Sequence, residues 1–465
     1  FNAFIEKWMP LVTPACLIIG VVFSVWLGRF APLVPWLFAF MTFAGSLGSG
    51  FRDMKKIAII GAGAAGMTAA IAAARTAEEK KNPCEIFLLE HNDLPGRKIL
   101  STGNGRCNLT NEKMGLPHFH SQDLQKAAVV LNAFGLEETL SFFHGLGLQT
   151  KSRNGYVYPR SDQAAAVRIL MELELKRRRI QVHSGIHVDE IQKAEDGFVI
   201  SGSGKQFLAD RVILATGGRA AAALGSDGSG YKLARSLGHS LLPVVPALVQ
   251  LKAKPHPLSK ASGVRVEGKV TAICGGREMA GDQGELQITS YGISGIPVFQ
   301  ISRHIALALV QGEPAQVVVD LVPWMEEEEF CSFLKKRAEG REAVAAGDFL
   351  IGIFPEKLIP ALLSIARIKK DLPVGELEPE AFPRFARICK SVFLKISDTN
   401  GFDNAQVCAG GIPLAEVNET TMESRCVNGL YLAGEILDVD GECGGYNLQW
   451  AWSSGYLAGL HAAQL

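Results

Sequence analysis

The sequence predicts an α/β fold in which a parallel sheet with flanking helices is interrupted by an inserted β-rich and helical domain and preceded by a transmembrane helical hairpin. Three observations predict this fold. A short apolar strand, a Gly-rich turn and an Ala-rich helix follow one another from about Met54. Two further strand-and-turn segments lie far downstream, and the start of the chain contains two long uncharged runs. We therefore expect four parts: residues 1–53, 54–245, 246–397 and 398–465.

The composition is that of a globular chain with no excess charge. Of its 465 residues, 48% are hydrophobic and 20% are charged, and 47 basic side chains balance 47 acidic ones. This balance gives no electrostatic reason to expect a nucleic-acid partner. The nine cysteines include no Cys-x-x-Cys pair, which argues against a disulfide framework, a zinc site or a dithiol redox centre. We expect a cytoplasmic globular region without a bound metal.

The first part of the chain is expected to form two membrane-spanning helices. No charged residue lies between Lys7 and Arg29 or between Arg29 and Arg52, and each run of ~20 residues can cross a hydrocarbon core of ~30 Å. The alternatives are a buried helix pair or a signal peptide, although a signal peptide has a single apolar stretch. The basic residues Arg52 and Lys55 after the second run predict that both ends of the hairpin face the cytoplasm.

The first part of the chain contains two distinctive motifs, Glu6-Lys7-Trp8-Met9-Pro10 and Phe43-Ala44-Gly45-Ser46-Leu47-Gly48. Through these motifs, residues 1–53 resemble the beginning of the bile acid:sodium symporter family. The resemblance covers only the first helices of such a transporter, so it implies no transport site. Because the chain begins at Phe1 and not at Met, we expect a fragment in which residues 1–53 are either a fusion or a joined reading frame.

The segment from Lys55 to Glu90 has the order that binds a dinucleotide. A strand over 55–60 runs into Gly61-Ala62-Gly63-Ala64-Ala65-Gly66, and a helix over 67–77 follows. In such a turn the first glycine permits a tight bend, the second lets the backbone approach a pyrophosphate, and the third lets the helix pack on the strand. Glu90 ends the next strand, about 20 residues on, where an acid holds a ribose hydroxyl. A purely structural Gly-rich turn is the alternative, and it leaves Glu90 unexplained.

Two later segments favour FAD over NAD as the dinucleotide. A strand over 212–215 ends in Thr216-Gly217-Gly218, and another over 429–433 ends in Gly434-Glu435. A domain of the glutathione-reductase type, which is Rossmann-like, returns to its nucleotide sheet with such strands. A helix over 448–460 then follows Gly444-Gly445-Tyr446-Asn447-Leu448, and its positive N-terminal end would stabilise the negative charge of a reduced flavin.

The most distinctive motifs are Pro-Gly-Arg-Lys-Ile-Leu-Ser-Thr-Gly-Asn-Gly-Arg-Cys-Asn-Leu-Thr-Asn over 95–111, Gly-Glu-Ile-Leu-Asp-Val-Asp-Gly over 434–441 and Gly-Gly-Tyr-Asn-Leu-Gln-Trp-Ala over 444–451. With these motifs, residues 54–465 resemble the bacterial FAD-dependent oxidoreductases described as aminoacetone oxidase-like proteins and dehydro-bile-acid reductases. The resemblance covers this whole region and implies FAD as the cofactor and a redox activity. It implies no single substrate, because the names within the family differ.

These motifs also supply candidate cofactor contacts. Arg97 and Lys98 are expected on the phosphate or adenosine side, with a solvated basic pair as the alternative. The loop Thr102-Gly103-Asn104 is expected beside the flavin, and Arg106 either bonds to oxygens of the cofactor or stabilises its own loop. Asp438 is expected at the ribityl or phosphate position.

Cys443 and Tyr446 are the candidate catalytic residues, because both lie in the expected flavin-side loop and can carry a proton. The alternative for Cys443 is a small buried thiol, and the alternative for Tyr446 is a packing role.

The part over 246–397 is expected to be an inserted domain that covers the flavin and selects the substrate, because pockets prefer domain interfaces. Apolar and polar residues alternate over 264–288, which predicts antiparallel strands, and the charged stretch 326–345 predicts helices. No second strand–Gly-rich turn–helix unit is present, so we expect no dedicated NAD(P)H domain, although NAD(P)H is the expected electron donor.

The leading hypothesis for function is reduction of an activated carbon–carbon double bond in a small molecule. The substrate would be an enone, with steroid or bile-acid-like compounds included, and hydride would pass from flavin N5 while a nearby acid supplies the proton. The alternatives are an FAD-dependent oxidase of small amines and a non-catalytic FAD module held at a membrane by residues 1–53.

Overall fold

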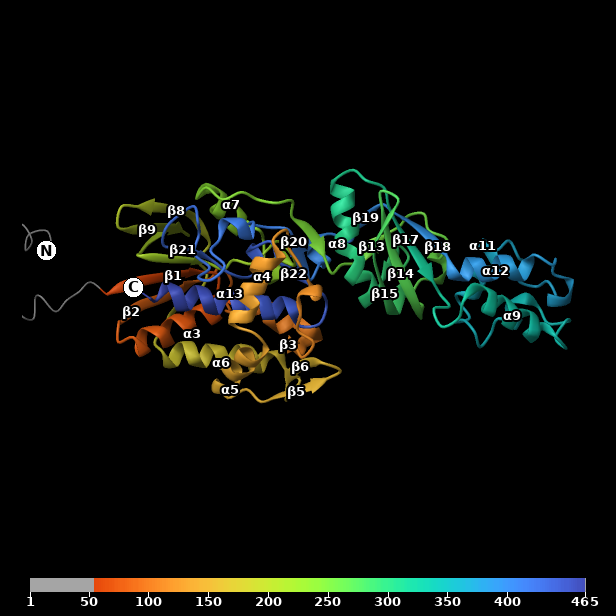
Figure 1. Ribbon diagram of the computed structural model, residues 1–465, viewed down its shortest axis with the longest axis horizontal. Helices are drawn as coiled ribbons and strands as arrows, with labels where there is room; N and C mark the ends of the chain where they lie inside the picture. The colour runs from red at the N-terminus through yellow and green to blue at the C-terminus, as the bar shows by residue number, and fades with distance from the viewer. Residues whose placement is uncertain (1–53, 465) are drawn as a thin grey trace, which may run out of the picture. The chain divides into compact units, whose positions relative to one another are not determined.

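The computed structural model describes residues 54–464 (Figure 1). The predicted hairpin of residues 1–53, with its orientation, lies outside the described residues. Among the helices within 54–464, none is both long enough and apolar enough to cross a membrane.

A five-stranded parallel sheet forms the centre of the nucleotide-binding part, in the order β21-β11-β1-β2-β7. The strands are rich in Ile, Leu and Val and largely buried, as expected for parallel strands covered on both faces. The predicted return of two distant strands is confirmed, because β11 pairs with β1 and β21 pairs with β11. The bounds are β1 Lys55–Ile60, β2 Cys84–Leu89, β7 Gln181–His183, β11 Arg211–Leu214 and β21 Leu430–Leu432.

Helices α3 (Ala64–Glu79) and α13 (Tyr446–Ala462) lie side by side beside this sheet (Figure 1). Glycines make the contact close: a Cβ at Gly455 would lie 2.4 Å from the carbonyl oxygen of Ala65, and one at Gly459 would lie 2.1 Å from that of Ala69. The order of these contacts makes the helices parallel. Helix α13 therefore extends beyond the start of α3 by about eight residues, or roughly 12 Å.

Smaller sheets and helices complete this part of the molecule. Three strands form an antiparallel meander, β8-β9-β10, and three others form the sheet β3-β6-β5. The bounds are β3 Thr110–Asn111, β4 Phe119–His120, α4 Leu124–Ala133, α5 Leu136–Gly145, β5 Thr150–Arg153, β6 Tyr156–Pro159, α6 Ala164–Arg177, β8 Val188–Ala194, β9 Gly197–Gly202, β10 Lys205–Ala209, α7 Ser229–Ser236, β12 Val245–Ala247, β20 Val407–Ala409 and β22 Asp440–Gly441.

The chain between β12 and β20 builds a seven-stranded sheet with its own hydrophobic core. The alternating segment 264–288 forms the antiparallel pair β14–β15, as predicted. The charged stretch 326–345 is helical only over α9, because Glu339 leaves the helical conformation and Gly340 has a φ of 72°. The bounds are β13 Leu251–Lys252, β14 Arg265–Cys274, β15 Arg277–Ile288, β16 Gly292–Ser294, α8 Ile296–Val310, β17 Ala315–Asp320, α9 Glu327–Ala338, α10 Ala346–Phe349, α11 Ile359–Ile365, α12 Ala381–Lys390, β18 Val392–Ile396 and β19 Asp398–Thr399.

Candidate active site

A cavity of about 720 Å³ opens at the carboxyl ends of the parallel strands. Ile60 and Leu89, the last residues of β1 and β2, line it together with the starts of α3 and α13. Ile296 and Phe299 of α8 line it as well, so the seven-stranded domain contributes to the wall. Crevices at the carboxyl ends of parallel strands are the usual ligand sites of open α/β sheets.

The turn before α3 leaves room for an anion. A Cβ at Gly61 would lie 2.5 Å from the carbonyl oxygen of Ala215, and one at Gly66 would lie 1.9 Å from that of Gly61. A Cβ at Gly63 would meet no atom within 4 Å. Gly61 and Gly66 are therefore required by contacts within the protein, whereas Gly63 keeps space open. Helix α3 begins without a side-chain cap, so its first N–H groups, with Ala64 and Ala65 on the wall, are free to bind phosphate oxygens.

Glu90 is buried beside this turn, with 7% of its surface exposed. Its carboxylate accepts hydrogen bonds from the backbone N–H of Ala62 at 2.7 Å and from the backbone and side chain of Asn92 at 2.9 and 2.8 Å. These donors hold the carboxylate on the cavity wall, and its remaining lone pairs can accept from a ribose hydroxyl.

Two buried polar atoms on the cavity wall have no hydrogen-bond partner within the described part of the chain. They are Oγ1 of Thr216 and Oδ1 of Asn108. An unpaired buried polar group costs about 1–3 kcal/mol, so a polar ligand that reaches these atoms is favoured. The open space at Gly63, the free helix start and these two atoms together fit a ligand with a pyrophosphate and several hydroxyl groups, as FAD has.

At the other end of the cavity, α13 also begins without a side-chain cap. Gly444 and Gly445 have φ values of 130° and 95°, which favour glycine. A Cβ at Gly444 would lie 2.7 Å from the Tyr156 ring, and one at Gly445 would lie 2.7 Å from the carbonyl oxygen of Thr110. Contacts within the protein therefore already require glycine at both positions.

Most of the predicted contact residues reach the cavity wall. They are Gly61, Gly63, Ala64, Ala65, Glu90, Arg97, Lys98, Thr102, Gly103, Asn104, Arg106, Thr216, Gly217, Gly434, Glu435, Cys443, Gly444, Gly445, Asn447 and Leu448.

Three predicted residues, Gly66, Asp438 and Tyr446, do not reach the wall. Gly66 packs α3 onto its own turn. The buried carboxylate of Asp438 accepts from the backbone N–H of Gln122 at 2.9 Å. The Tyr446 side chain stacks on His118, and its hydroxyl donates to the carbonyl of Lys113 at 3.3 Å. Tyr446 therefore has the packing role that was the alternative to a catalytic one.

Lys98 has a partner that its sequence position did not indicate. Its ammonium lies 2.9 Å from a carboxylate oxygen of Glu435, and it also donates to the carbonyl of Ala220. The other Glu435 oxygen accepts from the backbone N–H of Cys408. The charge of Lys98 is therefore offset by Glu435, a pairing that its position in the sequence did not indicate. Arg97 forms no ion pair within the described chain and donates only to Asn92, at 3.3 Å.

Several side chains that shape the α13 end of the cavity carry no signal in the sequence that would place them there. Tyr156 and Tyr158 come from β6, Leu248 directly follows β12, and Val407 begins β20. Together with Phe299 they form an aromatic and apolar wall. The alternation in Tyr156-Val157-Tyr158 indicates a strand with both tyrosines on one face, but no local pattern places that strand beside α13.

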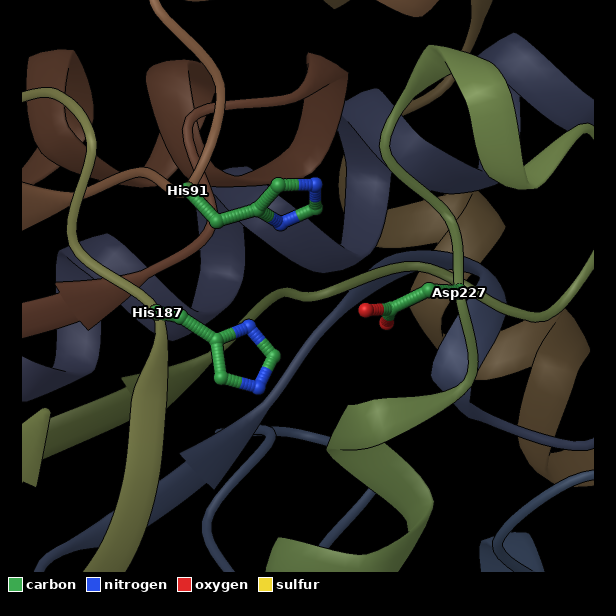
Figure 2. A group of neighbouring side chains, drawn as sticks. All are labelled: His91, His187 and Asp227. Atoms are coloured by element: carbon green, nitrogen blue, oxygen red, sulfur yellow. The ribbon is translucent and has the colours of Figure 1, made fainter. Parts of the chain in front are cut away.

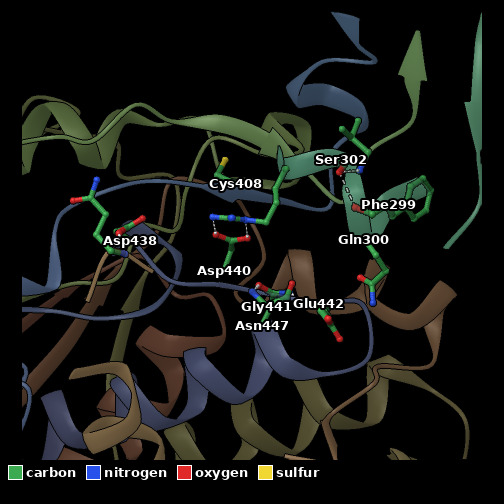
Figure 3. A network of polar contacts seen from close by, with 12 residues as sticks. Phe299, Gln300, Ser302, Cys408, Asp438, Asp440, Gly441, Glu442 and Asn447 are labelled. Carbon is green, nitrogen blue, oxygen red and sulfur yellow. Dashed lines mark hydrogen bonds and ion pairs between the residues drawn. The ribbon is translucent and has the colours of Figure 1, made fainter. Parts of the chain in front are cut away.

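The loop between β22 and α13 is held against α8 by polar contacts (Figure 3). The guanidinium of Arg303 binds the Asp440 carboxylate through two hydrogen bonds of 2.9 and 3.2 Å. The backbone N–H of Cys443 donates to Oε1 of Gln300 at 2.8 Å. Asn447 donates to and accepts from the backbone of Gly441. These contacts place Cys443 on the cavity wall.

Burial controls the protonation of the groups in this wall. It raises the pKa of the Cys443 thiol to about 12, with Asp282 and Glu442 adding to the effect. Burial also raises the pKa of Tyr156, with Cys443 and Tyr158 adding. Both groups therefore keep their protons at neutral pH and can act as proton donors.

The fold and this cavity define a flavin-dependent enzyme of the α/β dinucleotide-binding class. The chain belongs to the HI0933-like family, because the family described as "HI0933-like protein Rossmann domain" matches residues 55–461. The predicted FAD-dependent oxidoreductase, and the family resemblance on which it depended, are confirmed.

The chain is 54% identical over 411 residues to the 3-dehydro-bile acid delta(4,6)-reductase of Clostridium scindens, which covers 88% of this chain and all of that protein. It is 30% identical over 406 residues to the ribosomal RNA dihydrouridine synthase of Escherichia coli, covering 86% of this chain and 95% of that one. The solved structure of a 3-ketosteroid-delta4-(5alpha)-dehydrogenase from Rhodococcus jostii is 15% identical in sequence and superposes with a TM-score of 0.43. The match covers 90% of this chain and 99% of the dehydrogenase chain.

Proposed function

We propose that this protein reduces a carbon–carbon double bond conjugated to the 3-oxo group of a steroid or bile-acid-like compound, with NAD(P)H as the electron donor. The observation that carries the proposal is the 54% identity to a 3-dehydro-bile acid delta(4,6)-reductase along that protein's whole length. The apolar and aromatic wall at the α13 end of the cavity supports it, because a steroid nucleus is rigid and apolar.

When bound, FAD supplies the hydride that adds to the β-carbon of the enone. The residues that would hold it are the uncapped start of α3, Glu90, and the uncapped start of α13. The positive end of α13 would favour a negatively charged group bound beside it. The wall residues Phe299, Leu248 and Val407 exclude water from the reacting carbon atoms.

The α-carbon needs a proton, and Tyr156 and Cys443 are the groups on the wall that can supply it. The Tyr156 phenol makes no hydrogen bond with any described residue, so its proton is free for a ligand. The Cys443 thiol is held at the same end of the cavity by the backbone bond to Gln300. We propose Tyr156 as the donor, with Cys443 as the second candidate; Tyr446 is set aside, because it lies off the cavity wall and its hydroxyl already has a backbone partner.

A single-turnover experiment tests both the substrate class and the donor. Anaerobically reduced enzyme is mixed with a 3-oxo-4-ene or 3-oxo-4,6-diene steroid, and flavin reoxidation is followed by absorbance. Removal of a general acid usually costs ~10²–10⁴-fold, so Tyr156→Phe should slow reoxidation by that factor, with Tyr446→Phe as the matched control. Reoxidation of the Tyr156→Phe enzyme at the parent rate would remove Tyr156 as the donor.

The same preparation separates the alternative functions. Peroxide release with a small amine in air would support an amine oxidase. Reduction of ribosomal RNA would support the activity that the more distant relatives' name describes, although the balanced charge of this chain offers no electrostatic gain on a polyanion. If no enone reoxidises the flavin, the proposed substrate class is wrong.

A further inference from the structure

Three side chains from separate loops converge near the Glu90 end of the cavity (Figure 2). His91 directly follows Glu90, His187 precedes β8, and Asp227 precedes α7. One ligand atom from each lies within 4.8 Å of those of the other two. Figure 2 shows the two imidazoles and the carboxylate directed toward a common space.

These side chains are not engaged by other partners that would explain the convergence. Among the described residues, neither imidazole makes a hydrogen bond, and the nearest carboxylate to His187 outside the group is that of Asp189, at 4.0 Å. One oxygen of Asp227 accepts from the backbone and side chain of Ser229, which orients the carboxylate and leaves its second oxygen free.

A second group of potential ligands, His239, Glu416 and Cys426, differs in this respect. Both ring nitrogens of His239 are already used: one lies 2.8 Å from the Glu416 carboxylate and the other lies 2.9 Å from the Ser424 hydroxyl. That group is a completed hydrogen-bond network, whereas the group around His91 has unused ligand atoms.

We propose that His91, His187 and Asp227 form a binding site for a divalent ion of the zinc class. Two imidazoles and one carboxylate are a typical ligand set for Zn²⁺, and three protein ligands leave a fourth position open. Ligand atoms around a tetrahedral Zn²⁺ at ~2.0 Å lie about 3.3 Å apart, so closing the site requires side-chain shifts on the order of 1 Å. The absence of a Cys-x-x-Cys pair from the sequence argues only against zinc sites built from cysteines. The proposed site contains no cysteine ligand.

The position of the site gives it a physical role. His91 and His187 lie on the cavity wall, whereas Asp227 does not. A bound ion would therefore link three loops, separated by 96 and 40 residues along the chain, at the rim of the Glu90 end. Because the ion binds only the folded arrangement, it should raise the stability of the folded protein. The open coordination position would face the cavity rim.

The test uses the full chain with FAD bound, treated with a chelator and then dialysed. Calorimetric titration with Zn²⁺ should give one ion per chain, and Co²⁺ should produce tetrahedral absorption bands at wavelengths longer than flavin absorbs. Asp227→Asn is the most informative variant, because an asparagine can still accept from Ser229. It should weaken Zn²⁺ binding by ~100-fold or more while FAD stays bound. His91→Gln and His187→Gln should do the same to Zn²⁺ binding.

His144→Gln is the matched control, because His144 is an exposed histidine on α5, remote in sequence from the site, and its variant should bind Zn²⁺ as the parent does. Two results would overturn the proposal. One is the absence of a stoichiometric Zn²⁺ site in the FAD-loaded protein, including the case where Zn²⁺ binds only after FAD is removed. The other is a site that survives all three substitutions. Neither result depends on the substrate that the enzyme reduces.

Discussion

At the scale of single residues, the Glu90 end of the cavity depends on one buried carboxylate. Glu90 fixes the Gly-rich turn through Ala62 and its own loop through Asn92. A side chain that is held on both sides cannot swing away when a ligand arrives, so little conformational entropy is lost on binding. The role of Glu90 was expected from its distance along the chain, but its partners were not.

Glu90→Ala should weaken FAD binding by about 1–3 kcal/mol, because the N–H groups of Ala62 and Asn92 lose their acceptor and the ribose loses its contact. FAD affinity is measured by equilibrium dialysis of the apoprotein. Glu85→Ala is the control, since Glu85 lies on β2, the strand that ends directly before Glu90, and pairs only with the exposed ammonium of Lys56. FAD affinity unchanged in Glu90→Ala would show that Glu90 is not a cofactor contact.

At the scale of secondary structure elements, close helix packing brings two uncapped helix starts to one cavity. Helix α13 runs parallel to α3, and it packs closely because Gly455 and Gly459 admit the α3 backbone. The start of α13 then lies roughly 12 Å beyond that of α3, which matches an extended cofactor with phosphates at one helix and a charged ring at the other.

Gly63→Ala and Gly66→Ala should affect different properties: the first should affect FAD binding and the second the stability of the fold. A methyl group at Gly63 meets no protein atom and the φ of Gly63 is −80°, so the apoprotein should keep its melting temperature while FAD affinity falls by at least about tenfold. A methyl group at Gly66 lies 1.9 Å from a carbonyl oxygen and should destabilise the fold itself. Calorimetry of the apoproteins and FAD titration separate the two effects, and tight FAD binding by Gly63→Ala would contradict the phosphate site.

The contact between β4, β22 and α8 should make stability depend on pH. Burial, with Arg303 and His304 nearby, lowers the pKa of His120 to about 3. Below pH ~6.5 the unfolded chain binds a proton that the folded protein does not, so this residue lowers stability as pH falls. The loss reaches about 2 kcal/mol at pH 5. Burial raises the pKa of Asp440 to about 6, which acts in the opposite direction between pH 6 and pH 4.

His120→Gln should therefore lose less stability than the parent between pH 7 and pH 5, by about 2 kcal/mol, when unfolding in urea is compared at the two values. His144→Gln, at an exposed histidine, should follow the parent curve. A parallel decline of the His120→Gln and parent proteins would show that His120 binds a proton in the folded state.

At the scale of the molecule, two large hydrophobic cores are joined by helix α8, and a small cluster of Leu248, Val407 and Phe299 lines the cavity next to that helix. One core belongs to the parallel sheet and its helices and the other to the seven-stranded domain. Helix α8 joins them, because it packs on β14 and β15, binds Asp440 through Arg303, and presents Phe299 to the cavity. The substrate wall is therefore a property of both domains together.

A chain of residues 54–465 should fold and bind FAD as the longer chain does. The described cores and the cavity draw all their residues from this region, and the family match begins at residue 55. Flavin content after purification and the melting temperature check this prediction. Loss of FAD or failure to fold would mean that residues 1–53 contribute to the enzyme.

The sequence by itself determined the parallel sheet, the Gly-rich turn and the position of Glu90 after the second strand, because these depend on local order: a strand, glycines at set positions, and a helix start. It also predicted that the loop with Cys443 and Asn447 lies at the cavity. Only the tertiary structure decided that Lys98 pairs with Glu435, that Tyr446 packs against His118, and that Tyr156 and Phe299 line the cavity. Those outcomes depend on contacts between segments far apart in the chain, and no local spacing or periodicity encodes which distant side chain will occupy a given wall.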